Sequence, residues 1–371
     1  MEVIRAGKAG ACYGVQRALD MADEVLAAGG RAYTLGPLIH NPQVVADLAA
    51  RGAEAVGSVG EVAAREAALA PGGAPARRDA RDADASAPAL VGAAPAGAAP
   101  SASAPAVPHG GGMAAGVLEA LWADAAPAAA LADAPASASA APADAAPATP
   151  NAPAGAPASV VIRSHGVTPD VLDAVEEAGF TLVDATCPHV SRAQHAAAEL
   201  ARAGCRVVVL GEARHPEVEG LTAWAREAGG KVDVVAGPDD IPEGLYDPIG
   251  VVAQTTQRRE NLDAVVAALR ERGLDPLVKN TICSATGQRQ QAAAELAGTV
   301  DAMVVIGGRN SSNTTRLAEI CAQGCPRAFH IESADELDPA WFSGCARVGV
   351  TAGASTPEDQ IAAVEARLRS L

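Results

Sequence analysis

The chain has 371 residues and a formal net charge of −16, and 49% of its residues are hydrophobic although only 2% are aromatic. This acidic balance excludes the basic surfaces that bind nucleic acid or anionic membranes. No segment approaches the roughly 20 consecutive apolar residues of a membrane-spanning helix, and the first residues contain no apolar signal region. We therefore expect a cytoplasmic protein without a membrane partner.

The first 60 residues predict a short strand, Cys12, a helix through Met21, a strand at residues 31–36, and then His40. A second helical pattern follows His40. The cysteine directly precedes a helix, and the histidine directly follows a strand. This order of elements is the first instance of a pattern that recurs along the chain.

The composition changes from about residue 70 to about residue 157, where Ala, Pro, Ser, Gly and Asp dominate. Such a segment has little large apolar surface to bury, and its prolines interrupt regular structure. We expect a disordered insertion with no catalytic part, in which only residues 112–126 favour a short helix. Regular patterning resumes at residue 159, where a strand and a helix complete what the first 60 residues begin.

A cysteine, a helix, a strand and a polar residue occur in this order twice more. The separation is 28 positions in all three cases: Cys12 and His40, Cys187 and His215, and Cys283 and Ser311. Three matching separations in one chain indicate an internal repeat. The sequence therefore predicts an α/β fold of three pseudo-symmetric units, namely 1–186 (interrupted by the insertion), 187–282 and 283–371.

The second half of each repeat is a buried strand, a small polar turn and an amphipathic helix. The turns place His165, Thr255 and Ser355 at similar positions. In open parallel sheets, ligands bind at the carboxyl ends of the strands, where these turns lie. If the three units surround a pseudo-threefold axis, their polar turns and their cysteines meet at one centre.

Cys12, Cys187 and Cys283 each precede a helix, whose N-terminal dipole lowers a thiol pKa and favours the thiolate that binds metal. Soft sulfur ligands suit zinc or an iron-sulfur cluster. Three cysteines without a fourth leave one coordination position open, as a catalytic metal requires. Their wide spacing excludes a short zinc knuckle, so this metal site depends on the repeat and not on a local motif.

The other four cysteines are weaker candidates. Cys205 opens an apolar strand, so we expect it in the core. Cys321, Cys325 and Cys345 form a rival metal cluster, because the first two lie four residues apart, but no fourth ligand supports it.

Polar residues in the repeated turns favour a small anion. Hydroxyl, amide and imidazole donors at helix N-termini bind phosphate oxygens, so the implied ligand is a phosphate or diphosphate. The donors are His40, His165, His215, Thr255, Ser311, Ser312, Asn313 and Ser355. Glu217, two residues after His215, is the carboxylate best placed to carry a proton. No P-loop motif is present.

The remaining histidines carry less weight. His189 and His195 follow Cys187 on one helix, and we expect both on the surface. His109 and His330 have no supporting context.

Several phrases in this order resemble the LytB-type family of 4-hydroxy-3-methylbut-2-enyl diphosphate reductases, over nearly everything except residues 70–157. The phrases are CYGVQRAL, LGPLIHNPQVV, SHGVTP, DATCPHV, HPEVEG, AQTTQ, NTICSAT, NSSNTTRL and VTAGAS. The resemblance implies a central [4Fe-4S] cluster on Cys12, Cys187 and Cys283 and a proton delivered by Glu217. It also implies that Thr255 lies near the substrate and that the diphosphate is held by the matching polar residues: His40, His165, His215, Ser311, Ser312, Asn313 and Ser355.

The implied reaction is the reductive dehydroxylation of the allylic diphosphate to isopentenyl and dimethylallyl diphosphate. The chain has no GxGxxG fingerprint of a flavin or nicotinamide site, so its electrons come from an external donor of the ferredoxin or flavodoxin type. Two alternatives stay open at this point. One is a non-redox enzyme with zinc on the same cysteines, and the other is an iron-sulfur sensor or carrier, against which the anion-binding residues count.

Overall fold

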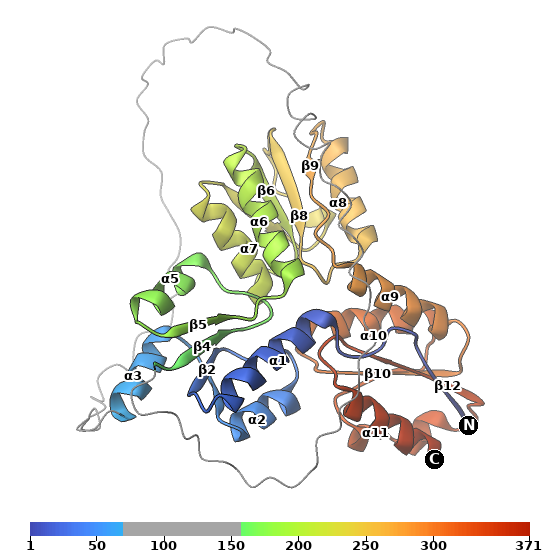
Figure 1. Cartoon of the computed structure of the whole chain (residues 1–371). Coiled ribbons are helices and arrows are strands. Elements are labelled where there is room, and N and C mark those ends of the chain that lie inside the picture. The colour runs from blue at the N-terminus through green and yellow to red at the C-terminus, as the bar shows by residue number, and fades with distance from the viewer. Residues whose placement is uncertain (70–156) are drawn as a thin grey trace, which may run out of the picture. The chain divides into compact units, whose positions relative to one another are not determined.

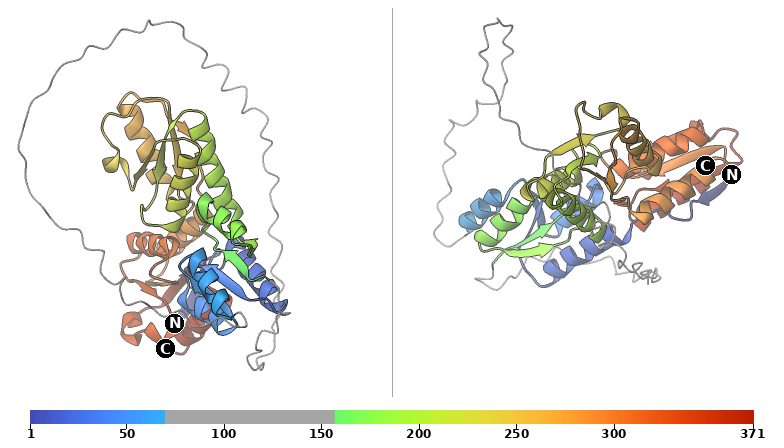
Figure 2. Two further views of the ribbon diagram at one scale, coloured as in Figure 1. Left: turned by 90° about the vertical axis from the view of Figure 1, so that its left-hand side faces the viewer. Right: turned by 90° about the horizontal axis from the view of Figure 1, so that it is seen from above.

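A computed structural model describes residues 1–69 and 157–371. All of these residues belong to the same unit of the chain. The predicted insertion, including the short helix at 112–126, lies outside these described residues apart from its last position. Figures 1 and 2 show the described chain as strands flanked by helices. It contains three four-stranded sheets in which every neighbouring pair of strands is parallel. The predicted class, α/β with three units, is confirmed.

The first sheet has the order β3-β2-β4-β5. Its strands are β2 (Ala32–Leu35), β3 (Ala53–Val56), β4 (Ser159–Ile162) and β5 (Thr181–Asp184). Its helices are α1 (Tyr13–Ala27), α2 (Pro42–Ala50), α3 (Val59–Leu69) and α5 (Pro169–Glu177). Strands β2 and β4 pair directly although the insertion lies between them in sequence. The residues from 159 onward thus complete the first sheet.

The second sheet has the same order of strands, β7-β6-β8-β9. Its strands are β6 (Arg206–Leu210), β7 (Val232–Val235), β8 (Ile249–Ala253) and β9 (Leu277–Val278). Its helices are α6 (Pro188–Arg202), α7 (Pro216–Glu227), α8 (Arg259–Glu271) and the short 3-10 helix η1 (Pro238–Asp240).

The third sheet, β1-β12-β10-β11, takes one strand from the start of the chain. Its strands are β10 (Ala302–Ile306), β11 (Ala328–Ile331), β12 (Arg347–Ala352) and β1 (Glu2–Arg5). Its helices are α9 (Ser284–Ala297), α10 (Ser312–Gly324), α11 (Glu358–Arg369), η2 (Ala334–Glu336) and η3 (Pro339–Phe342).

The position of β1 corrects the grouping of residues 1–186 as one unit. Strands β5, β9 and β1 occupy equivalent edges of the three sheets, and each leads directly to one of the three cysteines. The N-terminal strand therefore closes the repeat by joining the last sheet, where it lies beside the C-terminal helix α11 (Figures 1 and 2). The unit boundaries after residues 186 and 282 stay predictions.

Each sheet is buried on both faces, as the continuous apolar runs of its central strands require. In β6, Val207 and Val209 pack against α6 and α7, whereas Val208 and Leu210 pack against α8. The first and third sheets likewise separate two apolar clusters each. With few aromatic residues, the core relies on small side chains that allow close helix contacts, such as Ala193 and Ala197 of α6. The carboxyl ends of the strands stay available for a site.

Candidate functional site

One pocket is lined by residues from all three units. Every residue that the sequence singled out as a site residue lines it: Cys12, His40, His165, Cys187, His215, Glu217, Thr255, Cys283, Ser311, Ser312, Asn313 and Ser355. These positions are spread over most of the chain and meet because the three sheets direct their strand ends toward one place. The juxtaposition was predicted from the repeat, whereas the role of each residue stays a proposal.

The three cysteines occupy the same place in their units. Each is the N-cap residue of the helix that follows it, α1, α6 or α9, and no side chain of the three makes a capping hydrogen bond. All seven cysteines of the chain are free. The three N-cap thiols are therefore available for another partner in the pocket.

Gly14 in the first turn of α1 allows Cys187 to approach Cys12. A Cβ atom at Gly14 would overlap with Sγ of Cys187 and lie 3.1 Å from its Cβ. Cys12 and Cys283 both interact electrostatically with Cys187. The absence of a side chain at residue 14 thus makes room for the group of thiols.

For Cys187 the protein's own groups raise the thiol pKa, contrary to the expectation of a low value. Burial is the main reason that its pKa is raised to about 11; neighbouring Cys12 and Cys283 act in the same direction, and the backbone N–H donors of His189 and Val190 oppose the shift. The helix N-terminus acts in the predicted direction, but desolvation outweighs it. A bound cationic centre is the partner that would favour three thiolates here.

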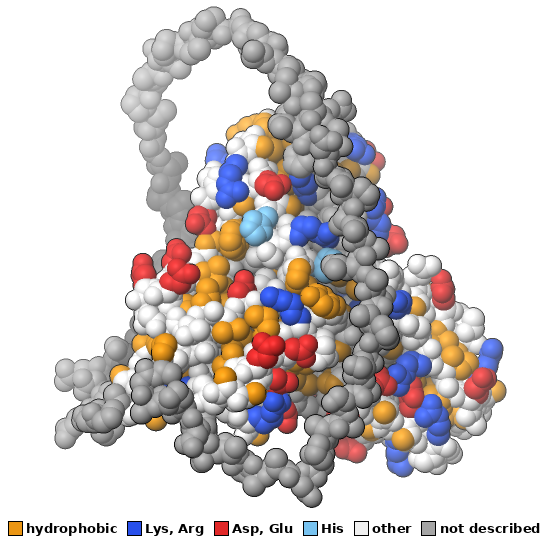
Figure 3. Space-filling model, viewed as in Figure 1, with side chains coloured by type: hydrophobic (Ala, Val, Ile, Leu, Met, Phe, Trp, Pro, Cys, Tyr) orange, Lys and Arg blue, Asp and Glu red, His pale blue; other side chains and the backbone are white. Residues whose placement is uncertain are grey.

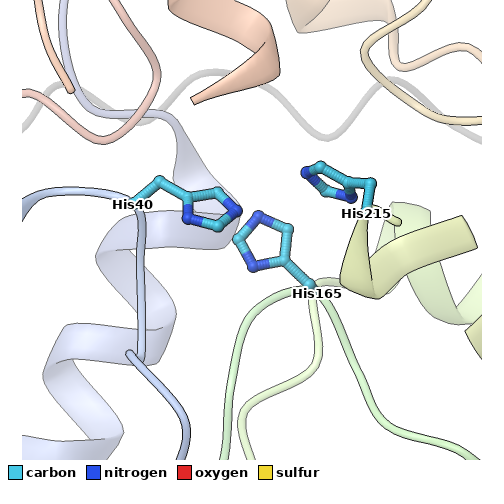
Figure 4. A group of neighbouring side chains, drawn as sticks. All are labelled: His40, His165 and His215. Atoms are coloured by element: carbon cyan, nitrogen blue, oxygen red, sulfur yellow. The ribbon is translucent and has the colours of Figure 1, made fainter. Parts of the chain in front are cut away.

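The three pocket histidines form a cluster (Figure 4). Their rings point toward one another from the turn before α2, the turn after β4 and the start of α7. The ring centroids of His40 and His165 are 4.4 Å apart, and those of His215 lie 5.4 and 5.2 Å from them. Both ring nitrogens of His40 and Nδ1 of His165 are buried without a hydrogen-bond partner among the described residues. Unpartnered polar atoms of this kind indicate a site for a ligand.

Burial keeps these histidines neutral. It lowers the pKa of His40, lowers that of His165 well below its usual value, and lowers that of His215 to about 3. The mutual proximity of the rings and the nearby Arg163 act in the same direction. Nδ1 of His215 accepts a hydrogen bond from the backbone N–H of Glu217 at 3.1 Å, so the proton of its neutral ring lies on Nε2.

Glu217 is a buried carboxyl group at the start of α7, with 1% of its surface exposed. Thr255 donates to it twice, from its backbone N at 2.6 Å and from Oγ1 at 3.0 Å. Burial raises the pKa of Glu217 to about 7, although the two Thr255 donors act to lower it. The group is therefore poised to hold or release a proton near neutral pH.

Hydroxyl and amide groups of the third unit complete the pocket. Ser311 is the N-cap of α10, and its Oγ accepts from the backbone N of Thr314 at 3.4 Å. Ser312 Oγ donates to the Glu212 carboxylate at 2.7 Å, whereas both side-chain atoms of Asn313 are buried without a partner among the described residues. Together with the helix N-terminus, these donors suit an anion.

His189 corrects the expectation of a surface residue, because it is half-buried and lines the pocket. Its position two residues after Cys187 could have indicated that His189 lines the pocket. Thr286, in the first turn of α9 after Cys283, also lines the pocket. The sequence analysis did not single it out. His195 is exposed, as predicted.

The rival cysteines belong elsewhere. Cys205, Cys321 and Cys325 are buried in apolar clusters, and Cys345 accepts a hydrogen bond from Arg327. His330 makes a hydrogen bond with the carbonyl oxygen of Gly307, and His109 lies outside the described residues.

Comparison with known proteins agrees with this geometry. The family model described as LytB protein matches residues 3–85 and 137–369. A protein of Geobacter metallireducens named 4-hydroxy-3-methylbut-2-enyl diphosphate reductase is 36% identical over 374 residues, covering 100% of this chain and 98% of that protein. One of the same name from Citrifermentans bemidjiense is 37% identical, with 98% of each chain covered.

A solved structure described as (E)-4-hydroxy-3-methyl-but-2-enyl diphosphate reductase, the terminal enzyme of the non-mevalonate pathway, is also similar. It has a TM-score of 0.56 and 32% identity, and 100% of both chains is covered. With a family model and full-length relatives both matching, the conclusion is direct: this chain belongs to the LytB protein family.

Proposed function

We propose that this chain is an oxidoreductase that reduces 4-hydroxy-3-methylbut-2-enyl diphosphate to isopentenyl diphosphate and dimethylallyl diphosphate. The observation that carries the proposal is the convergence of three free cysteines, three histidines and a buried glutamate on one pocket. An anaerobic assay with the iron-loaded protein and a chemical reductant tests it directly. Formation of both products supports the assignment, and intact substrate under these conditions contradicts it.

A [4Fe-4S] cluster on Cys12, Cys187 and Cys283 fits the residues present. Three free thiols line the same pocket, none is engaged in helix capping, and Gly14 leaves room for them. Three thiolates match the softness that iron-sulfur centres require, and a cluster with three protein ligands leaves one iron open. When bound, the cluster supplies electrons one at a time and a Lewis-acidic iron.

The chain's own residues bind the substrate and manage its protons. The imidazoles, the hydroxyls and the N-terminus of α10 hold the diphosphate, and Glu217 and Thr255, which also line the pocket, act on the hydroxyl group that leaves. The net reaction consumes two electrons and two protons, breaks the allylic C–O bond, forms a C–H bond and releases water. The protonated form of Glu217 provides one of these protons.

Replacing Gly14 with alanine is expected to reduce the iron content of the protein. The added methyl group would occupy the space of the Cys187 sulfur, so one ligand must move out of position. The measurement is iron per chain after anaerobic reconstitution. Gly287→Ala is the matched control, since this helical glycine also follows one of the three cysteines but has open space around it. Equal iron in both variants would contradict the expected crowding.

Diphosphate binding is expected to strengthen as pH falls from 8 to 6. The pKa of each pocket histidine is lowered in the free protein, so the imidazoles are neutral, and a bound polyanion favours their protonated forms. Titration calorimetry with inorganic diphosphate, in buffers of different ionisation enthalpy, should detect proton uptake on binding.

His215→Asn should weaken this pH dependence and keep the start of α7, because asparagine is a good N-cap. His195→Asn, on the exposed surface, should leave it unchanged. Affinity that does not vary with pH, beyond the titration of diphosphate itself, would show that the histidines do not take up protons.

An external electron donor of the ferredoxin or flavodoxin type is part of this proposal. Tyr13, directly after Cys12, is 68% exposed, so the cysteine site lies near the surface where a carrier could dock. On the face seen in Figure 3, acidic, basic and apolar side chains are interspersed.

We also propose a cytoplasmic location, because seven free cysteines suit a reducing compartment. In the part of the chain that the structure describes, no helix is sufficiently long and apolar to span a membrane.

A further inference from the structure

Arg289 is a buried cation next to the cysteine site. It lies on α9, the helix that begins after Cys283, and only 5% of its surface is exposed. Its Nη2 donates to the carbonyl oxygen of Gly10 at 2.8 Å, and its Nη1 donates to that of Ala285 at 3.3 Å. Nε is buried without a hydrogen-bond partner among the described residues. A buried guanidinium with neutral partners needs an explanation, because burying an uncompensated charge is costly.

Cys12 and Cys283 are the titratable groups that influence Arg289 within the described residues. No carboxylate within the described residues forms an ion pair with Arg289, whereas Arg316 of α10 pairs with Glu212. Burial lowers the pKa of Arg289, and the electrostatic influence of neighbouring Cys12 and Cys283 acts to raise it. As ligands of the proposed cluster, Cys12 and Cys283 would be thiolates, and they would then supply the opposite charge that Arg289 lacks.

Arg289 also connects the segments that carry two of the cysteines. Gly10, whose carbonyl oxygen accepts from Nη2, lies two residues before Cys12 and has a φ of +100°. That backbone conformation favours glycine, and a Cβ there would lie 2.9 Å from Cδ1 of Ile361. The guanidinium thus holds the loop before α1 against the first turns of α9.

We infer that Arg289 is a positioning residue whose fixed positive charge balances the thiolates of Cys12 and Cys283 and raises the reduction potential of the cluster they would hold. The inference rests on the proposed cluster. Reduction adds a negative charge to a site that already contains thiolates, so a nearby buried cation stabilises the reduced state more than the oxidised state. Losing the charge therefore makes reduction harder.

The test compares three variants of the iron-loaded protein under anaerobic conditions. Arg289→Gln removes the charge but keeps a hydrogen-bonding side chain, and Arg289→Lys keeps the charge. Arg259→Gln removes a charge from an exposed arginine of α8 that pairs with Asp263, and so controls for net charge alone. The readouts are the midpoint potential from a redox titration followed by electron paramagnetic resonance, and the iron content per chain.

We expect Arg289→Gln to shift the midpoint to lower potential, whereas Arg289→Lys and Arg259→Gln stay near wild type. If Arg289→Gln does not retain iron, Arg289→Lys still tests the inference. This variant keeps the positive charge, so it should retain the cluster. An unchanged potential in Arg289→Gln, or an equal loss in the lysine variant, overturns the inference. Wild-type protein without an iron-sulfur cluster would instead overturn the proposed function, and this inference with it.

Discussion

Replacing Cys283 with serine is expected to abolish cluster binding and with it the reductase activity. Loss of an outer hydrogen-bond partner of a metal ligand commonly costs about 10–100-fold in affinity or activity, and loss of a thiolate ligand should exceed that range. Serine is a suitable substitute because Cys283 is the N-cap of α9, a position that serine favours. Helix α9 should therefore begin at the same residue in the variant, so that any loss of function is due to the missing thiolate.

Cys345→Ser is the matched control for this prediction. Cys345 lies outside the pocket and accepts a hydrogen bond from Arg327, which a serine oxygen can also accept. Iron content, the visible spectrum and turnover should all remain near wild type in this variant. Retention of a full cluster in Cys283→Ser would show that the three cysteines are not the ligands.

Glu217→Gln is expected to lower kcat by about 10²–10⁴-fold, the usual contribution of a positioned general acid. Glutamine is close in shape, and its one amide oxygen can still accept the hydrogen bond from the backbone N of Thr255, but it carries no acidic proton. The cluster should remain, because Glu217 is not among its proposed ligands. Anaerobic steady-state kinetics and the iron content measured on the same sample separate these effects.

The pH profile gives Glu217→Gln a second readout. With a pKa of about 7, Glu217 is protonated at lower pH and loses its proton as pH rises, so the wild-type rate should fall above pH 7. The rate of the Glu217→Gln variant should not show this decrease above pH 7. Glu219→Gln is the control, since Glu219 is exposed in the same helical turn. A Glu217→Gln variant with wild-type kcat would remove this residue from the proton pathway.

The sequence predicted which residues lie together better than it predicted the environment of each group. The three equal separations identified residues hundreds of positions apart that now line one pocket, because each repeat places the same turn at the end of a parallel strand. Side-chain burial was not accessible in this way. The helix N-terminus predicted a low pKa for Cys187, but the pKa is raised, because desolvation depends on neighbours from other units.

Two further misses have the same physical origin. The pairing of β1 with β12 joins the two ends of the chain, and a local pattern of apolar residues does not specify which sheet an edge strand enters. Likewise, Arg289 stands within the stretch around Cys283, but its hydrogen bond to Gly10 spans 279 positions. Contacts of this range follow from the assembled fold and not from spacing.

Iron analysis and electron paramagnetic resonance of the anaerobically purified wild-type protein, with and without the allylic diphosphate, test the central claim most directly. We predict about four irons per chain, a signal of a reduced [4Fe-4S] cluster, and a change in that signal when the substrate is added. Stoichiometric zinc, or an iron-sulfur signal that the diphosphate does not perturb, would contradict the assignment of one pocket that holds both the cluster and the substrate.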